Sequence, residues 1–382
     1  MVTLLSPDRR GSDCNKWGRY PADVIPLWVA DMDYAADPAI VQALQDRLTH
    51  PVLGYCGPGE KLREILVAAI RRDHGWRIEP DWLMFLPGVE PGFNMALHAF
   101  TQPGDGLLQE LPVYKPLRAS AGFWELDLLG VDQIQRDGAW ISDEPALAAA
   151  AARARAHILC NPQNPTGRVY TRDELERRAE LCLKHDLVLI SDEIHCGLTL
   201  DGRAHLPIAS LSPEIARRSI TLMAASKTWN IAGLKAAFAI VPDASMRMQM
   251  LAAKSGLVDS VNIFGLAGTE AAYGCLEWRD AIRAQLAANR DLLARQLALR
   301  MPKARMIPAQ ASFLAWIDFT ALELPLPAAE FFLHEARVAL GAGNDFGIGL
   351  ESWARLNFGT PPETLIEALD RMQAASAAVS RD

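Results

Sequence analysis

The chain has 382 residues, 50% of them hydrophobic and 22% charged, a balance typical of globular proteins that excludes disordered, collagen-like and coiled-coil chains. Its 38 Lys and Arg against 46 Asp and Glu give a net charge of −8 without any basic block, so nucleic-acid binding is not expected. No apolar run approaches the roughly 18 residues of a membrane-spanning helix, so no membrane association is expected either.

The N-terminal 40 residues contain several Pro and Asp and little periodicity, which predicts irregular chain. Charge appears there too early for a secretory signal. The six cysteines lie far apart and form no Cys-x-x-Cys pair, which is typical of reduced thiols in the cytoplasm. Residues 61–73 have apolar side chains at helical spacing, followed by His74-Gly75 as a stop, and predict a helix.

Short apolar runs and helical patterns alternate through the middle of the chain. Helices are predicted at 144–155 and, from a Thr-x-x-Glu capping box, at 171–185. The runs predicted as buried strands are 83–86, 107–108, 157–160, 187–190 and 220–224. This alternation favours an α/β fold with a mostly parallel sheet and helices on both faces.

The last third of the chain has a different pattern. Residues 262–297 predict one long helix or two in succession. Strands are then predicted at 305–319 and 353–358, around a helix at 328–340, which suggests a smaller α+β domain. We expect a large domain at 45–285 and a small domain formed by 1–44 plus 286–382.

Polar segments follow three of the predicted strands. Asn-Pro-Gln-Asn-Pro-Thr-Gly (161–167) follows the strand predicted at 157–160. Ser-Asp-Glu-Ile-His (191–195) follows the one at 187–190, and Ser-Lys-Thr-Trp-Asn (226–230) follows the one at 220–224. A glycine-containing segment at 87–92 precedes a helix near 93–100, and such turns can receive phosphates. Because ligands bind beyond the carboxyl ends of parallel strands, an amide, a carboxylate and a lysine are expected to converge on one site.

Each segment alone has a plainer explanation, as a turn, a helix cap or a solvated lysine. Lys227, however, lies between two apolar stretches, and burial lowers a lysine's pKa toward the neutral amine that Schiff-base chemistry needs. The P-loop, dinucleotide-loop and zinc-protease motifs are missing, and Gly341–Gly347 has the wrong spacing for a nucleotide loop. Glu193 and His195 have no evident third ligand, so no metal is expected.

The ordered segments resemble the fold-type I pyridoxal 5′-phosphate (PLP) enzymes of the class I/II aminotransferase group, over nearly the whole chain. Residues 27–34 (Leu-Trp-Val-Ala-Asp-Met-Asp-Tyr) and Asp-Glu-Ile-His (192–195) resemble the MalY/PatB-type cystathionine β-lyases within that group. So do Gly54-Tyr55, Pro112-Val-Tyr114, 226–234 and Arg355-Leu-Asn-Phe. The resemblance implies a three-layer α/β/α large domain with a mostly parallel sheet, a smaller α+β domain, and PLP as cofactor.

The resemblance also implies the reactive groups. Lys227 would hold PLP as a Schiff base and then act as the base at the substrate Cα, and Asp192 would keep the pyridine nitrogen protonated. Asn164 would hydrogen-bond the phenolic oxygen of PLP, and Tyr114 would stack on its ring. His195 stands where related enzymes often carry a tyrosine.

The remaining implied roles concern the phosphate and the substrate carboxylate. The groups implied for the phosphate are the backbone N–H of Val89 and Glu90, Ser226, Lys235, and Tyr55 from the other subunit of a homodimer. Arg355, with the N–H of Ala30, would hold the carboxylate as a bidentate fork. Lys235 stands where many relatives carry an arginine, and Glu90 places a carboxylate in the phosphate loop, so its side chain should point away from the phosphate.

The implied activity is a carbon–sulfur β-lyase that cleaves L-cystathionine or related cysteine conjugates to a thiol, pyruvate and ammonia. An aminotransferase acting on an amino acid and a 2-oxo acid would use the same residues and stays open as the alternative. A third possibility is a regulatory or interaction protein that keeps the scaffold without the chemistry, but Lys227, Asp192 and Asn164 are all present, which argues against it.

Overall fold

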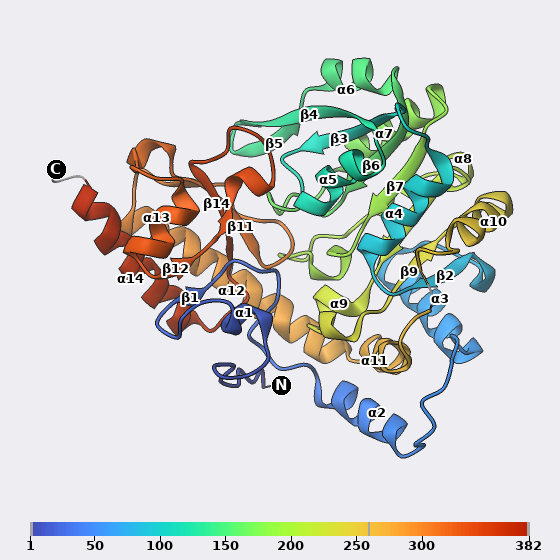
Figure 1. Ribbon diagram of the computed structural model, residues 1–382, viewed down its shortest axis with the longest axis horizontal. Coiled ribbons are helices and arrows are strands. Elements are labelled where there is room, and N and C mark those ends of the chain that lie inside the picture. Colours follow the sequence, from blue (N-terminus) through green and yellow to red (C-terminus); the bar gives the residue numbers. More distant parts are fainter. Residues whose placement is uncertain (1–2, 259, 380–382) are drawn as a thin grey trace.

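The computed structural model describes residues 3–258 and 260–379. An eight-stranded sheet, in the order β2-β9-β8-β7-β6-β3-β4-β5, forms the centre of its larger part (Figure 1). In that order the strands are Leu83–Leu86, Ala237–Ile240, Ser219–Met223, Val188–Asp192, Ala154–Cys160, Gly106–Leu111, Asp127–Arg136 and Ala139–Ser142. The neighbours from β8 through β4 run parallel, whereas β9 and β5 run antiparallel to their neighbours. The predicted mostly parallel sheet is therefore confirmed.

Helices cover both faces of this sheet. Neighbouring residues of a strand point to opposite sides, and here the side chains on both sides are apolar and need to be buried. Ile158 and Ile190 pack in one apolar cluster with α4 (Val89–Phe100), α5 (Lys115–Phe123) and α10 (Ala244–Ala253). The adjacent Leu159 and Leu189 pack on the other side with α6 (Glu144–Ala151), α7 (Arg172–Lys184) and α8 (Pro213–Ala216). This is the three-layer α/β/α arrangement that was expected.

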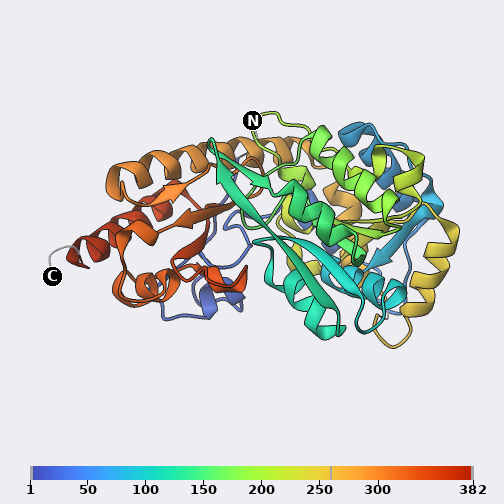
Figure 2. The ribbon, with the colours of Figure 1, turned by 90° about the horizontal axis from the view of Figure 1, so that it is seen from above.

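A second, four-stranded antiparallel sheet has the order β10-β11-β14-β13. Its strands are Arg305–Met306, Leu314–Asp318, Trp353–Asn357 and Gly341–Ala342, and α13 (Ala328–Glu335) and α14 (Pro362–Val379) lie beside them. The helix α12 (Leu276–Arg300) extends from the larger part to this sheet (Figure 2). The expected boundary at residue 285 falls inside α12, and the division into two domains stays a prediction.

The N-terminal chain packs against the smaller sheet. Most of residues 3–40 are irregular, as expected, apart from the short elements α1 (Asn15–Gly18) and β1 (Ile25–Pro26) and the start of α2 (Pro38–Leu48). β1 pairs in parallel with β12 (Val338–Ala339). That tertiary pairing explains why α13 stops at Glu335 instead of reaching residue 340 as predicted.

Other predicted elements agree closely with the structure or are divided by it. The capping box at Thr171 is present and α3 spans Glu60–His74, as expected. The helix predicted at 144–155 ends at Ala151, and the segment 262–297 forms two helices, α11 (Ile263–Ala272) and α12. The strand predicted at 305–319 is split into β10 and β11. Within the described ranges no helix is both long and apolar enough to cross a membrane.

Candidate active site

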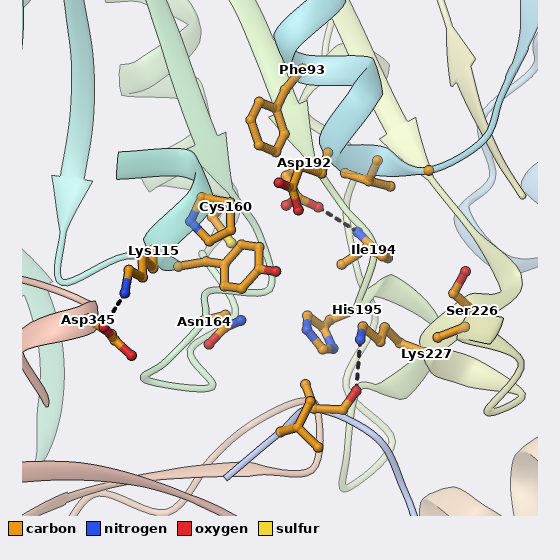
Figure 3. Close-up of a pocket in the computed structure, with 18 of the residues that line it drawn as sticks. Phe93, Lys115, Cys160, Asn164, Asp192, Ile194, His195, Ser226, Lys227 and Asp345 are labelled. Atoms are coloured by element: carbon orange, nitrogen blue, oxygen red, sulfur yellow. Dashed lines mark hydrogen bonds and ion pairs between the residues drawn. The ribbon is translucent and has the colours of Figure 1, made fainter. Parts of the chain in front are cut away.

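The carboxyl ends of β6, β7 and β8 open into one cavity of about 1060 Å³. Asp192 is the last residue of β7, Asn164 lies in the loop after β6, and Lys227 lies in α9 (Ala225–Thr228), directly after β8. Figure 3 shows these three side chains and His195 around a common space. Of the site residues predicted from the sequence, all line this cavity except Tyr55.

Lys227 carries the amine at the centre of the cavity. Its Nζ donates a hydrogen bond to the backbone carbonyl of Ala30 at 2.8 Å (Figure 3). Burial, helped by the positive charge of Arg355, lowers the pKa of Lys227 to about 8. An amine with this pKa is about one tenth neutral at pH 7, far more than an exposed lysine.

Asp192 is buried, and burial raises the pKa of its carboxyl group to about 6. The backbone N–H of Ile194 donates to its Oδ1 at 3.1 Å, and the charge of Lys227 also favours the ionised form. A buried carboxylate with so few partners is suited to a cationic partner from a ligand.

The next carboxylate, Glu193, has a different environment. It accepts hydrogen bonds from Ser191 Oγ at 2.8 Å and from His205 Nε2 at 2.6 Å, and it does not line the cavity. Glu193 therefore fixes the end of β7 to a neighbouring loop. In residues 3–258 and 260–379 no group of three or more His, Cys, Asp or Glu is placed to hold a metal ion.

Arg355 projects from β14 into the same cavity. Its Nη1 donates to Asn164 Oδ1 at 3.1 Å, its Nη2 donates to the Trp28 carbonyl at 2.9 Å, and its guanidinium lies 4.9 Å from the Phe346 ring centroid. Burial lowers the pKa of Arg355 to about 10, so it stays cationic at neutral pH. Its buried Nε has no hydrogen-bond partner in the described part of the chain.

Tyr114 and His195 complete the wall of the cavity. Tyr114 precedes the first turn of α5, and burial together with the charge of Glu90 raises its pKa to about 12. Burial lowers the pKa of His195 to about 3, so its imidazole is neutral. The buried Nδ1 of His195 has no partner among the described residues, which leaves a polar atom for a ligand.

The end of the cavity predicted for a phosphate is formed by the first turn of α4. Val89 and Glu90 are the first two residues of this 12-residue helix, where backbone N–H groups have no intrahelical acceptor. Ser226 and the exposed Lys235 line the same cavity. Glu90 is exposed and its carboxylate accepts no hydrogen bond within residues 3–258 and 260–379; that it avoids the phosphate stays a prediction.

Two asparagines that the sequence analysis did not single out hold the N-terminal stretch over the cavity. Asn230 Nδ2 donates to the carbonyls of Met32 and Tyr34 at 2.9 and 2.6 Å. Asn357 Nδ2 donates to the carbonyls of Val29 and Asp31 at 2.7 and 2.8 Å. Asn230 lies three residues after Lys227, and Asn357 lies two residues after Arg355. Their position inside these two recognised segments was the signal from which the sequence analysis could have found them.

The residues present fit PLP. Lys227 offers an amine of lowered pKa to its aldehyde, and the buried Asp192 offers a carboxylate to its ring nitrogen. The unpartnered Nδ1 of His195 and the first turn of α4 supply polar contacts for its oxygen and phosphate groups. A hydrophobic ligand would leave all of these groups unsatisfied.

The chain is similar to known proteins over nearly its full length. The family model for aminotransferase class I and II matches residues 22–372. The chain is 36% identical over 379 residues to cystathionine beta-lyase PatB of Bacillus subtilis (strain 168), covering 96% of this chain and 98% of that protein. The structure of cystalysin from Treponema denticola, which contains PLP, has a TM-score of 0.95 at 29% identity and covers 99% of this chain and 100% of its own. A PLP-bound putative aminotransferase from Clostridium difficile 630 has a TM-score of 0.94 at 33% identity, with coverage of 97% and 98%.

Proposed function

Because the chain belongs to the aminotransferase class I and II family, we propose that it is a carbon–sulfur β-lyase acting on L-cystathionine or related cysteine conjugates. The products are a thiol, pyruvate and ammonia, with one water consumed. One observation carries this proposal: the near full-length similarity to a cystathionine β-lyase, at 36% identity. The cavity supports it, since it brings an amine, a carboxylate and an arginine together.

The cofactor is PLP. When bound, PLP withdraws electrons from the amino acid attached to it, which weakens the Cα–H bond. Asp192 would hold a proton on the ring nitrogen, and its burial makes that charge pair stronger than it would be in water.

Lys227 and Arg355 would act on the substrate itself. Arg355 would bind the α-carboxylate, with its unpartnered Nε as one available donor. Lys227 Nζ would remove the proton from Cα, since its lowered pKa allows it to be neutral near physiological pH. Fixing the carboxylate relative to the amine would decide which bond at Cα is broken.

We propose further that the protein is a homodimer whose subunits share their active sites. Tyr55 is 99% exposed in a single chain and lies on an extended segment between α2 and α3 (Figure 1). The neighbouring Val52 and Leu53 are 64% and 54% exposed, so this segment presents apolar side chains that a second subunit would bury. We place the protein in the cytoplasm, because its six cysteines are all free thiols.

The experiment that tests the activity is incubation of the PLP-loaded protein with L-cystathionine and no keto acid. Pyruvate, ammonia and a thiol are expected in equal amounts. Lys227→Ala, purified in the same way, should release none of them and should lack the visible absorbance of bound cofactor. Amine transfer that requires a keto acid, with no pyruvate from cystathionine, would instead identify an aminotransferase.

A further inference from the structure

Arg19 lines the cavity and is exposed to solvent. Its guanidinium carbon is 4.9 Å from the Trp28 ring centroid and 5.8 Å from that of Tyr20, and the two rings meet edge to face at 6.2 Å. Within the described residues, no carboxylate forms an ion pair or hydrogen bond with Arg19, whose side chain is exposed. A guanidinium stacked on aromatic rings keeps its N–H groups available for an anion.

The position of Arg19 is linked to that of Arg355 through a single residue. Trp28 carries the ring under Arg19, and its backbone carbonyl accepts the hydrogen bond from Arg355 Nη2. Both arginines line the same cavity. A substrate held at its α-carboxylate by Arg355 can therefore extend along the Trp28 wall toward Arg19.

The size of the cavity allows such a substrate. Its volume of about 1060 Å³ lies slightly above the usual range for sites that enclose drug-sized ligands. PLP and the three-carbon core of a cysteine leave part of this space unused. Tyr20 and Trp28 provide an apolar wall there, against which methylene groups beyond the sulfur would pack.

The charges of the lining residues single out Arg19. The basic lining residues are Arg19, Lys115, Lys227, Lys235 and Arg355, and the acidic ones are Glu90, Asp192 and Asp345. Lys115 pairs with Asp345 at 2.7 Å (Figure 3). Lys227 and Arg355 have the roles proposed above, and Lys235 is the lining residue expected to bind the cofactor phosphate. Arg19 is the one lining cation of the described chain left for a further anionic group.

We infer that Arg19 binds a carboxylate carried by the leaving group, so that the enzyme prefers cysteine thioethers with a second carboxylate beyond the sulfur. This inference rests on the proposed function, because it concerns the group that leaves with the sulfur. Arg19 acts in binding alone and takes no part in bond cleavage. Its guanidinium would exchange water for a charge-assisted hydrogen bond with the distal carboxylate.

The test uses the PLP-loaded enzyme and three thioethers of similar size: S-(2-carboxyethyl)-, S-(3-aminopropyl)- and S-propyl-L-cysteine. For the unchanged enzyme, KM should be lowest with the carboxyethyl compound. Arg19→Gln should raise that KM about tenfold, leave kcat unchanged, and leave KM for the propyl compound unchanged. Arg19→Glu should reverse the preference in favour of the aminopropyl compound, and Arg19→Lys should restore part of the original one.

The matched control is Arg10→Gln. Arg10 also stacks on a tryptophan, with its guanidinium carbon 5.1 Å from the Trp17 ring centroid, but it does not line the cavity. The Arg10→Gln variant should therefore leave KM for all three compounds unchanged. An equal rise of KM for all three in Arg19→Gln, no rise for any of them, or the same rise in Arg10→Gln would overturn the assignment.

The outcome can be separated from failure of the proposed function. If the unchanged enzyme releases no pyruvate from any thioether, the lyase activity is refuted. Dissociation constants for the same compounds can then be measured from the absorbance change of the bound cofactor. A tenfold loss of affinity confined to the carboxyethyl compound in Arg19→Gln would still support Arg19 as its binding residue, and equal affinities would refute it.

Discussion

At position 227 the ammonium group experiences opposing influences from its surroundings. Burial and the charge of Arg355 favour the neutral amine, whereas the carboxylates of Asp31 and Asp192 favour the charged form. Burial and the charge of Arg355 have the larger effect, and the pKa of Lys227 is lowered from 10.5 to about 8. The amine can therefore react with an aldehyde near neutral pH, which an ordinary exposed lysine does poorly.

This balance predicts the pH dependence of cofactor loading. In cofactor-free protein, the rate of PLP attachment should rise with pH and level off above about 8, since only the neutral amine attacks the aldehyde. Arg355→Met removes a neighbouring positive charge, so the pKa of Lys227 should rise and the midpoint should move to higher pH. Visible absorbance after mixing at each pH gives the rate. Arg10→Met should keep the original midpoint, and a downward shift in Arg355→Met would contradict the argument.

The role proposed for Asp192 predicts that removing its charge lowers turnover while the cofactor stays bound. Asp192→Asn keeps the size of the side chain but removes the charge that would hold a proton on the ring nitrogen. PLP should still attach to Lys227, while kcat for pyruvate release should fall on the order of 10²-fold or more. Asp345→Asn is the matched control, because that carboxylate pairs with Lys115 at the cavity edge. Near-normal turnover in Asp192→Asn would refute the role given to Asp192.

Among the elements, the loop after β6 carries Asn164 and also joins the two parts of the molecule. Gly167 ends this loop with φ +69°, and its carbonyl accepts hydrogen bonds from the backbone N–H groups of Gln310 and Ala311. A Cβ atom at Gly167 would lie 2.4 Å from the Cβ of Ala309. Glycine is therefore required here both for its backbone conformation and for space.

Gly167→Ala should consequently destabilise the protein more than Gly202→Ala does. Gly202 has the same φ of +69° but nothing within 4 Å of the added Cβ, so it measures the backbone strain alone. We expect about 1–2 kcal/mol from the strain in both variants, and about 1–3 kcal/mol more at Gly167 from overpacking. The midpoints of urea unfolding provide the comparison. Equal losses would show that the loop moves away from residues 309–311 at little cost.

At the scale of the whole molecule, the site is incomplete in one chain if Tyr55 belongs to it. Tyr55 does not line the cavity of its own chain, although all the other site residues predicted from the sequence do. A homodimer would explain why Tyr55 lies outside the cavity of its own chain. In a symmetric dimer each subunit can contribute the same segment to the active site of the other. Sedimentation should accordingly give a mass twice that of a single chain.

Mixed dimers provide a direct test of the shared site. Tyr55→Ala and Lys227→Ala should each be inactive or weak at limiting PLP. In a mixed dimer, one site combines the intact Lys227 of one subunit with the intact Tyr55 of the other. Random exchange of subunits should restore activity to about a quarter of that of the unchanged enzyme. No recovery, in a mixture shown to contain mixed dimers, would refute sharing.

Local patterns in the sequence were enough to predict the alternation of strands and helices and the order of the reactive residues. The strand predicted at 83–86 is β2, and the capping box at Thr171 begins α7, because apolar periodicity and capping depend on neighbouring residues. Lys227, Asp192 and Asn164 could be placed at one sheet edge because each follows a predicted parallel strand.

Contacts between groups that are distant in the sequence could not be predicted, because they depend on how the segments pack in three dimensions. The end of α13 follows from the pairing of β12 with β1, and the environment of Arg355 follows from its contacts with Trp28 and Asn164. Glu193 and Asp192 are adjacent in the chain, yet one is bound by His205 and the other faces the cavity. Burial and charge act through space. The pKa of Lys227, and the lack of a charged partner for Arg19 among the described residues, therefore follow from packing between segments that local sequence patterns do not relate.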